Sequence, residues 1–293
     1  MIGTRLDGGL GNQLFQYAAD RALALRHGTG LMLDLSALGK SVPGVTSRKL
    51  ELSNFKLSQS LVKSVQSGLP SWIHRFPVWS RWISPWRVYL EKHLGFNPQF
   101  SALPDNSFLI GYWQSFRYLS DVAEHLINDL TPIAPLSTAS MELARQIDSS
   151  VSVAIHVRRG DYVSLAAAAS FHGTLSEAYY LNAMREVSHA IEGARYFVFS
   201  DDPQWCRAHL VLDETAVMVT HNVGADSWQD LMLMSRCRNH IIANSSFSWW
   251  GAWLADQRCP KNASRMVIAP ARWFAGDPGM NLSDRFPPHW LIR

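Results

Sequence analysis

Cysteine is scarce in this chain of 293 residues, which contains Cys206, Cys237 and Cys259 and no others. Three cysteines at these spacings match neither a disulfide framework nor a zinc-binding motif. They favour a reducing compartment, and the N-terminus has no apolar segment behind a basic start that would indicate a signal peptide. We therefore expect a cytoplasmic protein.

Long apolar runs, strong charge and metal-binding patterns are also missing. No stretch of about 18 uncharged apolar residues is present, so no segment is predicted to span a membrane. The formal net charge of +3 is too small for a non-specific nucleic-acid binder, although it allows a local pocket for phosphates. Ser200-Asp201-Asp202 is not an Asp-x-Asp triplet, and no other cluster has metal-ligand spacing, so no bound cation is predicted.

The residues that are present predict a folded α/β protein. The composition is 47% hydrophobic and 17% charged, and a chain of 293 residues is expected to form two domains. Strand and helix patterns alternate, which is typical of parallel sheets with helices on both faces. The best linker is the proline-containing stretch 131–140, so we expect an N-terminal domain at 1–135 and a C-terminal domain at 136–293.

The N-terminal part opens with a strand at 2–6, a glycine-rich turn at 7–13 and a helix at 14–26. A second strand is predicted at 31–35, with Asp34 at its end. This arrangement is close to a dinucleotide-binding fingerprint, but from Gly9 it reads Gly-x-Gly-x-x-Leu and lacks the final small residue. A glycine-rich turn before a helix can serve any phosphate or sugar.

Residues 156–162, His-Val-Arg-Arg-Gly-Asp-Tyr, follow a buried-type strand predicted at 151–157. Ligands of doubly wound sheets bind at the carboxyl ends of the strands, and an arginine there can hold a phosphate with two hydrogen bonds. A purely structural ion pair between Arg158 and Asp161 explains the residue types equally well. On residue types alone, both interpretations stay open.

A second candidate segment connects a strand predicted at 240–243 with a helix predicted at 248–256. Small polar residues lie between them, namely Asn244, Ser245 and Ser246. The start of a helix presents unused N–H groups and the positive end of the helix dipole, which suit an anion. Plain N-capping is the more common use of serine at such a position, so this segment also has two interpretations.

Four blocks of the sequence together resemble glycosyltransferase family 11, the bacterial and animal α-1,2-fucosyltransferases. The blocks are 8–18, 111–115, 156–162 and 244–254, in the order of the family. The resemblance implies a metal-independent, inverting transferase of the GT-B type, with two Rossmann-type domains whose parallel sheets face a cleft. It implies no cofactor, GDP-β-L-fucose as the donor substrate, and the 2-hydroxyl of a galactose as the acceptor.

The resemblance also implies partners and places. The acceptor would be a galactose-terminated oligosaccharide or a lipid-linked glycan, taken by the first domain, and the second domain would bind GDP-fucose. The last helix is a candidate to cross back to the first domain. Tryptophans at 70–96 lie among basic residues, a pattern that suits stacking on acceptor sugars, peripheral contact with the inner face of an anionic membrane, or internal packing.

Similarity to the wider group of fucosyltransferases assigns roles to single residues. Arg158 is expected to hold the β-phosphate of the donor and to be catalytic, because without a metal it must meet the negative charge on the leaving GDP. His156 is expected to lie against the nucleotide, and Asp230 to bind the guanine. The other expected donor-binding residues are Asn244, Ser245, Ser246, Phe247, Gly9, Gly11 and Asn12.

The base that takes the proton from the acceptor hydroxyl has several candidates. The related α-1,6 enzymes have an acid shortly after the Arg-Arg-x-Asp segment, but here residues 163–170 contain none. This leaves Asp161, His172 and Asp7, of which we place Asp161 first. A dissociative transition state lowers the demand for a strong base, so a weak one can suffice.

Two other classes of function compete with this one. The glycine-rich turn and Asp34 suggest a nicotinamide-dependent oxidoreductase, but that activity leaves residues 156–162 without a role. The 12 tryptophans suggest a carbohydrate-binding module without catalysis, but such modules are usually rich in β-strands, whereas this chain alternates strand and helix.

Overall fold

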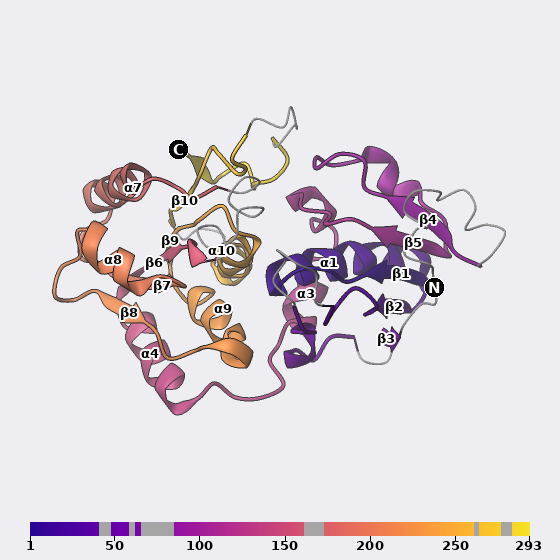
Figure 1. The fold of residues 1–293 in the computed structure, drawn as a ribbon, viewed down its shortest axis with the longest axis horizontal. Helices are drawn as coiled ribbons and strands as arrows, with labels where there is room; N and C mark the ends of the chain where they lie inside the picture. The colour runs from indigo at the N-terminus through magenta and orange to yellow at the C-terminus, as the bar shows by residue number, and fades with distance from the viewer. Residues whose placement is uncertain (41–47, 59–61, 66–84, 161–172, 261–263, 277–282) are drawn as a thin grey trace. The chain divides into compact units, whose positions relative to one another are not determined.

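The structure is a computed structural model that describes residues 1–293 apart from 41–47, 59–61, 66–84, 161–172, 261–263 and 277–282. The chain forms two compact units, and each contains a parallel sheet (Figure 1). Unit 1 comprises Met1–Ser41, Ser47–Ile133 and Gly279–Pro287, and unit 2 includes Ala134–Pro278 and Pro288–Arg293. The α/β fold with parallel sheets expected from the sequence is confirmed.

Within the described residues, the sheet of unit 1 has five parallel strands in the order β3-β2-β1-β5-β4. These strands are β1 Ile2–Arg5, β2 Leu31–Asp34, β3 Val62–Val65, β4 Arg87–Leu90 and β5 Ser107–Ile110. The helices are α1 Leu10–His27 and α3 Ala123–Asp129, with 3-10 turns at Leu52–Asn54, Pro98–Ala102 and Phe116–Tyr118. Helix α1 links β1 to β2 and lies with its N-terminus at the carboxyl ends of the strands, where ligands of such sheets bind.

Helix α1 begins four residues earlier than the pattern of apolar residues predicts, because the end of the glycine-rich turn is itself helical. Gly8 has φ +80°, and a Cβ there would lie 2.5 Å from the Asn12 side chain, so this tight turn requires glycine. A buried ion pair anchors the helix to α3. Arg21 Nε lies 2.8 Å from Asp129 Oδ2, which also accepts a hydrogen bond from the Tyr17 hydroxyl at 2.7 Å.

The described sheet of unit 2 is also parallel and has the strand order β11-β10-β9-β6-β7-β8. The strands are β6 Val151–Val157, β7 Ala194–Ser200, β8 Val217–Val219, β9 Asn239–Ile241, β10 Val267–Ala269 and β11 Leu291–Ile292. The helices are α4 Thr138–Asp148, α7 Glu177–Ala190, α8 Pro203–His209, α9 Trp228–Met234 and α10 Ser246–Arg258, with a 3-10 turn at Gly224–Asp226. None of the described helices is long and apolar enough to cross a membrane.

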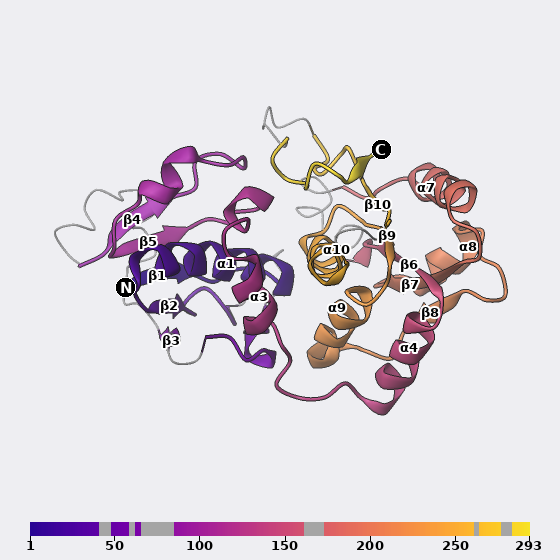
Figure 2. The ribbon, with the colours of Figure 1, turned by 180° about the vertical axis from the view of Figure 1, so that it is seen from behind.

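Strand β6 is buried on both faces, which explains its continuous apolar sequence. One face packs against α7 and α8, and the opposite face packs against α4 and α9 (Figure 2). Because side chains alternate along a strand, Ile155 faces α7 and α8, whereas Ala154 and His156 belong to the other face. The last described helix, α10, lies in unit 2.

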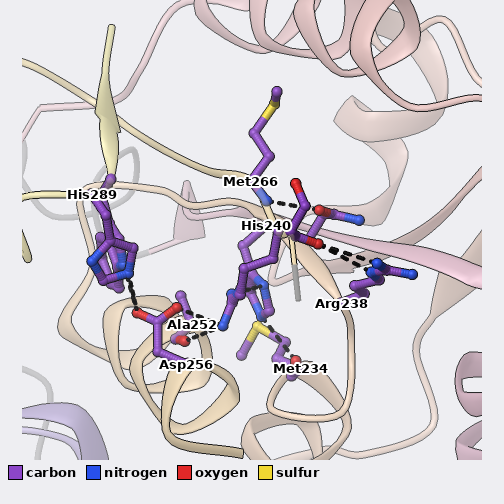
Figure 3. A network of polar contacts seen from close by, with 11 residues as sticks. Met234, Arg238, His240, Ala252, Asp256, Met266 and His289 are labelled. Atoms are coloured by element: carbon purple, nitrogen blue, oxygen red, sulfur yellow. Dashed lines mark hydrogen bonds and ion pairs between the residues drawn. The ribbon is translucent and has the colours of Figure 1, made fainter. Parts of the chain in front are cut away.

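A polar network holds α10 against β9 and the C-terminal segment (Figure 3). Asp256 forms an ion pair with Arg265 at 2.7 Å, and its second oxygen accepts the indole N–H of Trp290 at 2.7 Å. Arg265 also donates to His240 Nδ1 at 2.9 Å. Burial lowers the pKa of His240 well below its usual value, so the ring is neutral and its Nε2–H donates to the carbonyl of Met234.

Candidate functional site

The two arginines predicted from the sequence lie directly after β6. Arg158 Nη1 lies 2.8 Å from Asp201 Oδ2, and the two side chains are 24% and 25% exposed. Asp201 follows β7, the strand that pairs with β6, and its other oxygen accepts the backbone N–H of Arg159 at 2.8 Å. Asp201 therefore fixes both the guanidinium of Arg158 and the backbone after it. The sequence analysis considered Asp201 only as part of a possible metal-binding triplet, and it did not predict this role.

Arg159 and Gly160 complete this strand end in a different way. Arg159 Nε lies 3.3 Å from Asp202 Oδ2, and its guanidinium stacks 4.4 Å above the ring centre of Trp205 in α8. A Cβ at Gly160 would lie 2.8 Å from Asp201 Oδ2, so the close approach of Asp201 leaves no space for a side chain. Arg159 thus joins β6 to α8, whereas Arg158, which is exposed to a similar degree, pairs with Asp201.

His156 is a buried polar residue beside this arginine. Burial lowers its pKa to about 4, against the attraction of Asp201, so the imidazole is neutral at pH 7. Its Nδ1 is buried and has no hydrogen-bond partner among the described residues. The ring lies 5.9 Å from that of Phe247 on α10. A buried nitrogen without a partner is costly unless a ligand satisfies it, which supports a binding role.

Strand β9 also pairs with β6, so the start of α10 lies at the same edge of the sheet as Arg158. The helix begins at Ser246, two residues earlier than predicted. Ser245 is the N-cap residue, with φ −138°, and its side chain makes no capping hydrogen bond. The simple capping interpretation therefore does not describe Ser245. The N–H groups of the first turn point out of the helix start, where they suit an anion.

The side chain of Asn244 makes hydrogen bonds that stabilise this edge of the sheet. Its side chain is 2% exposed, and its amide donates to the carbonyls of Gly173 at 3.1 Å and Trp273 at 3.2 Å. The residue thus ties the end of β9 to two neighbouring loops. The sequence interpretation placed Asn244 among the donor-binding residues, and the structure gives its amide this positioning task.

Asp230 lies in the first turn of α9, behind the carboxyl end of β8. Burial raises the pKa of its carboxyl to about 7, and a hydrogen bond from Asn222 Nδ2 at 2.7 Å opposes that shift. The group is therefore close to the point at which it changes charge at neutral pH. Sequence reasoning singled out Asp230 but not Asn222, which follows β8 in a loop without a recognisable motif.

The expected residues of unit 1 lie at the start of α1. Gly9 is its N-cap residue and Gly11 is in the first turn. Asn12 accepts a hydrogen bond from Gln114 Nε2 at 2.8 Å, and Gln114 in turn accepts one from the buried Arg285 at 2.5 Å. Gln114 belongs to the block 111–115, whereas Arg285 comes from the other end of the chain and has no signal in the sequence.

Of the three candidate bases, only Asp7 lies within the described residues. Asp161 and His172 lie outside the described residues. Asp7 follows β1 and is exposed; one carboxyl oxygen accepts the N–H of Gly8 at 2.8 Å and the other accepts the Tyr112 hydroxyl at 3.4 Å. Among the residues described, no cluster of His, Cys, Asp or Glu could hold a metal ion.

The tryptophan-rich segment falls mostly outside the described residues, including Trp72, Trp79 and Trp82. The ring of Trp86 packs edge-on against that of Phe108, with 5.7 Å between the ring centres. At this position the internal-packing interpretation describes the tryptophan.

The parallel sheet and its strand-end arginine are typical of an enzyme that binds a phosphorylated ligand, and comparison with known proteins gives the family. The model of the family described as Glycosyl transferase family 11 matches residues 86–290. The chain is 33% identical to the Alpha-1,2-colitosyltransferase of Escherichia coli, covering 99% of this chain and 98% of that one. It is 31% identical to the O-antigen biosynthesis glycosyltransferase WbnK of Escherichia coli, covering 93% and 94%. The chain belongs to glycosyl transferase family 11 and is a glycosyltransferase.

More distant relatives agree with this assignment, and a solved structure agrees with the fold. The Galactoside alpha-(1,2)-fucosyltransferase 1 of Leontocebus fuscicollis is 26% identical over 85% of this chain, which spans 64% of that longer protein. The fold matches that of NodZ α-1,6-fucosyltransferase with a TM-score of 0.52 at 16% identity, covering 86% of this chain and 92% of that one. This likeness confirms the GT-B-like fold.

Proposed function

We propose that this glycosyltransferase moves L-fucose from GDP-β-L-fucose to the 2-hydroxyl of a galactose, with inversion at the anomeric carbon. The observation that carries the proposal is the position of Arg158 at the carboxyl end of β6, held by Asp201 at 2.8 Å. The start of α10 lies at the same edge. A cation and a helix N-terminus together suit the two phosphates of a GDP-sugar.

The chemistry of the transfer explains why such a site is needed. As the bond between fucose and phosphate breaks, positive charge develops on the sugar ring and negative charge on GDP. Arg158 and the N–H groups of α10 stabilise the departing diphosphate because they are already in place and need no reorganisation. The acceptor hydroxyl then attacks the opposite face of the ring and loses its proton to a base, for which Asp161, His172 and Asp7 are the candidates.

The name of one relative supports an alternative donor sugar, colitose. The relative that matches over 99% of this chain is named as a colitosyltransferase, and colitose is fucose without its 3-hydroxyl. We propose GDP as the carrier of either sugar, so the residues of unit 2 named above suit both donors. Membership of a glycosyltransferase family leaves no support for the oxidoreductase or the carbohydrate-binding module.

The acceptor is proposed to be a galactose-terminated oligosaccharide or a lipid-linked glycan at the inner face of the membrane. The name of the galactoside fucosyltransferase among the relatives supports a galactoside. No nucleic-acid partner is proposed, because the net charge of the chain is only +3.

The test is a screen of GDP-fucose and GDP-colitose against a panel of galactosides, with product linkage read by NMR. An α-1,2-linked product from either GDP-sugar supports the proposal and identifies the donor. Binding of GDP but not NAD should raise the thermal midpoint, because a ligand that binds the folded state stabilises it. A protein that GDP does not stabilise, and that forms no product with either donor, refutes the proposal.

A further inference from the structure

A chain of hydrogen bonds leads to the carboxylate of Asp230 from α4 and from the loop after β8. Asn222, which follows β8, donates from Nδ2 to Asp230 Oδ1 at 2.7 Å. The Ser140 hydroxyl, in α4, donates to Asn222 Oδ1 at 3.1 Å. His221 Nε2 lies 2.9 Å from the same hydroxyl. Ser140 is fully buried and Asn222 is 8% exposed, so solvent cannot easily replace these contacts.

The direction of these bonds follows from the chemistry of the groups. A carboxylate oxygen accepts, so Asn222 must present its amide N–H to Asp230 and its carbonyl to Ser140. The single hydroxyl proton of Ser140 is then used, and His221 Nε2 must be the donor to the Ser140 oxygen. Every bond therefore donates toward Asp230, and such a chain strengthens its own members and fixes the orientation of the last one.

The start of α4 is held in place independently of this chain. Ser137 caps α4 by accepting the N–H of Ser140, and its own N–H donates to Gln229 Oε1 at 2.8 Å. Gln229 is the neighbour of Asp230 in α9, and its amide contacts Asp226 at 3.3 Å. Ser140 and Asp230 are thus parts of one rigid arrangement of α4, α9 and the loop after β8.

We propose that Asn222, oriented by Ser140, is a positioning residue that fixes the Asp230 carboxylate for recognition of the guanine base. This inference rests on the proposed function and on the guanine-binding role that the family resemblance implies for Asp230. Guanine presents two adjacent N–H donors, and a carboxylate can accept both while one of its oxygens also accepts from Asn222, because each oxygen has two lone pairs. Adenine lacks this pair of donors, so the oriented carboxylate selects guanine.

Charge makes the role measurable. Burial raises the pKa of Asp230 to about 7, and the Asn222 hydrogen bond holds it below a still higher value. The ionised form accepts from guanine, so the preference for GDP should weaken as pH falls through 7. Losing the Asn222 bond should move the midpoint to higher pH, by about one unit or more for a hydrogen bond to a charged group. The other titratable groups of this arrangement are His221 and Asp226.

The experiment is calorimetric titration of the full-length protein with GDP and with ADP from pH 5.5 to 8.5. The dissociation constant of ADP divided by that of GDP measures the preference for GDP. The titration of the phosphates cancels from this ratio, because both ligands carry the same diphosphate. In the wild type this ratio should fall by about 30-fold from the high-pH limit to pH 5.5, as expected for a required group with pKa near 7. Asp230→Asn should abolish the change with pH.

Two variants test the positioning role. Asn222→Leu should lower the GDP preference at pH 7 by about fivefold and shift its midpoint upward by about one unit, and Ser140→Ala should shift it in the same direction by less. The matched control is Ser152→Ala, which removes another buried serine, at the opposite end of β6, that accepts the N–H of Arg238. It should leave both the preference and the midpoint unchanged.

The outcomes separate this inference from the function on which it rests. A wild type that does not bind GDP at any pH overturns the proposed function, and the inference with it. If GDP binds and Asn222→Leu and Ser140→Ala keep the wild-type midpoint, Asn222 has no positioning role and the proposed function stands. If Asp230→Asn keeps the pH profile, another group titrates and the inference fails. Equal weakening of GDP and ADP in folded variants would also overturn it.

Discussion

Replacing Arg158, alone and together with Asp201, tests the centre of the proposed donor site. Arg158 Nη1 lies 2.8 Å from Asp201 Oδ2, and the side chains are 24% and 25% exposed. In the proposed reaction, Arg158 meets the charge on the leaving GDP and Asp201 holds the guanidinium in place. Asp201→Asn should therefore slow the enzyme through Arg158, and the double variant should be no slower than Arg158→Ala, because the two residues act as one unit.

The magnitudes follow from these contacts. Removing a preorganised donor to a developing negative charge costs about 3 to 4 kcal/mol, or about a hundred- to a thousandfold in kcat. Asp201→Asn keeps the shape of the side chain and weakens a charge-assisted hydrogen bond worth about 1.5 to 3 kcal/mol, so we expect a loss of about tenfold or more. Solvent screens this partly exposed pair, and the free energy of unfolding should change by about 1 kcal/mol or less.

The assay is the initial rate of GDP release in the presence of a galactoside, with urea unfolding of each variant to report stability. Arg195→Ala is the matched control, because this arginine of β7 bonds to Thr215 and Gln146 and has no part in the proposed site. It should keep the wild-type rate. A folded Arg158→Ala enzyme whose rate stays within about threefold of the wild type, less than 1 kcal/mol, would refute the donor-site assignment. Additive losses in the double variant would refute the proposed role of Asp201.

Three further predictions concern stability. Asp129→Ala should cost about 3 to 5 kcal/mol in urea unfolding, because it leaves the buried Arg21 without its partner at 2.8 Å; no loss would contradict this. Asp256→Ala should cost a similar amount because it leaves the buried Arg265 without the carboxylate of its ion pair. Its thermal midpoint should be well below that of Asp148→Ala, which removes an exposed ion pair with Arg236. Burial raises the pKa of the Asp20 carboxyl well above its usual value. The folded state therefore keeps a proton that the unfolded state loses above about pH 4, and the free energy of unfolding falls as pH rises. Asp20→Asn should flatten that fall between pH 5 and pH 8 and raise the midpoint at pH 8; an unchanged slope would refute it.

Elements with a clear apolar pattern could be predicted from the sequence almost to the residue. The strand expected at 151–157 is β6, and the helix expected at 228–235 is α9, which ends one residue earlier. Helix α8 was missed, although Asp202 as N-cap and Pro203 in the first turn are signals of a helix start. Helix α4 was missed because the proline-containing stretch before it was assigned as a linker up to residue 140.

The strand expected at 108–113 ends earlier, at Ile110, because the residues after it leave the extended conformation. Trp113 has φ +56°, which is rare for a large side chain. Glu91 holds this turn by accepting the N–H of Tyr112 at 2.6 Å and that of Trp113 at 3.0 Å. A carboxylate twenty residues away in the sequence determines where the strand ends, so local propensity could not predict it.

In the site too, local sequence patterns predict some features, whereas contacts between distant residues determine others. Arg158 and Ser245 could be placed at one edge of a sheet because strand ends are visible in the sequence, but their partners depend on which strands are neighbours. Asp201 reaches Arg158 because β7 pairs with β6, from Val151↔Ala194 to Val157↔Ser200. A strand order that separated β6 from β7 would place that carboxylate elsewhere with no change in sequence. Positioning residues are therefore a property of topology rather than of motif.

This topology gives the proposed donor site a direction. At one end Arg158 is a cation whose partner Asp201 is itself a quarter exposed, and at the other Asp230 is a partly buried acid held by the neutral amide of Asn222. A diphosphate placed beside Asp230 would meet an unpaired negative charge, whereas guanine placed there meets an acceptor that suits its N–H groups. A reversed nucleotide would thus be unfavourable at both ends. The proposed orientation of GDP, with its phosphates toward β6 and its base toward α9, satisfies both.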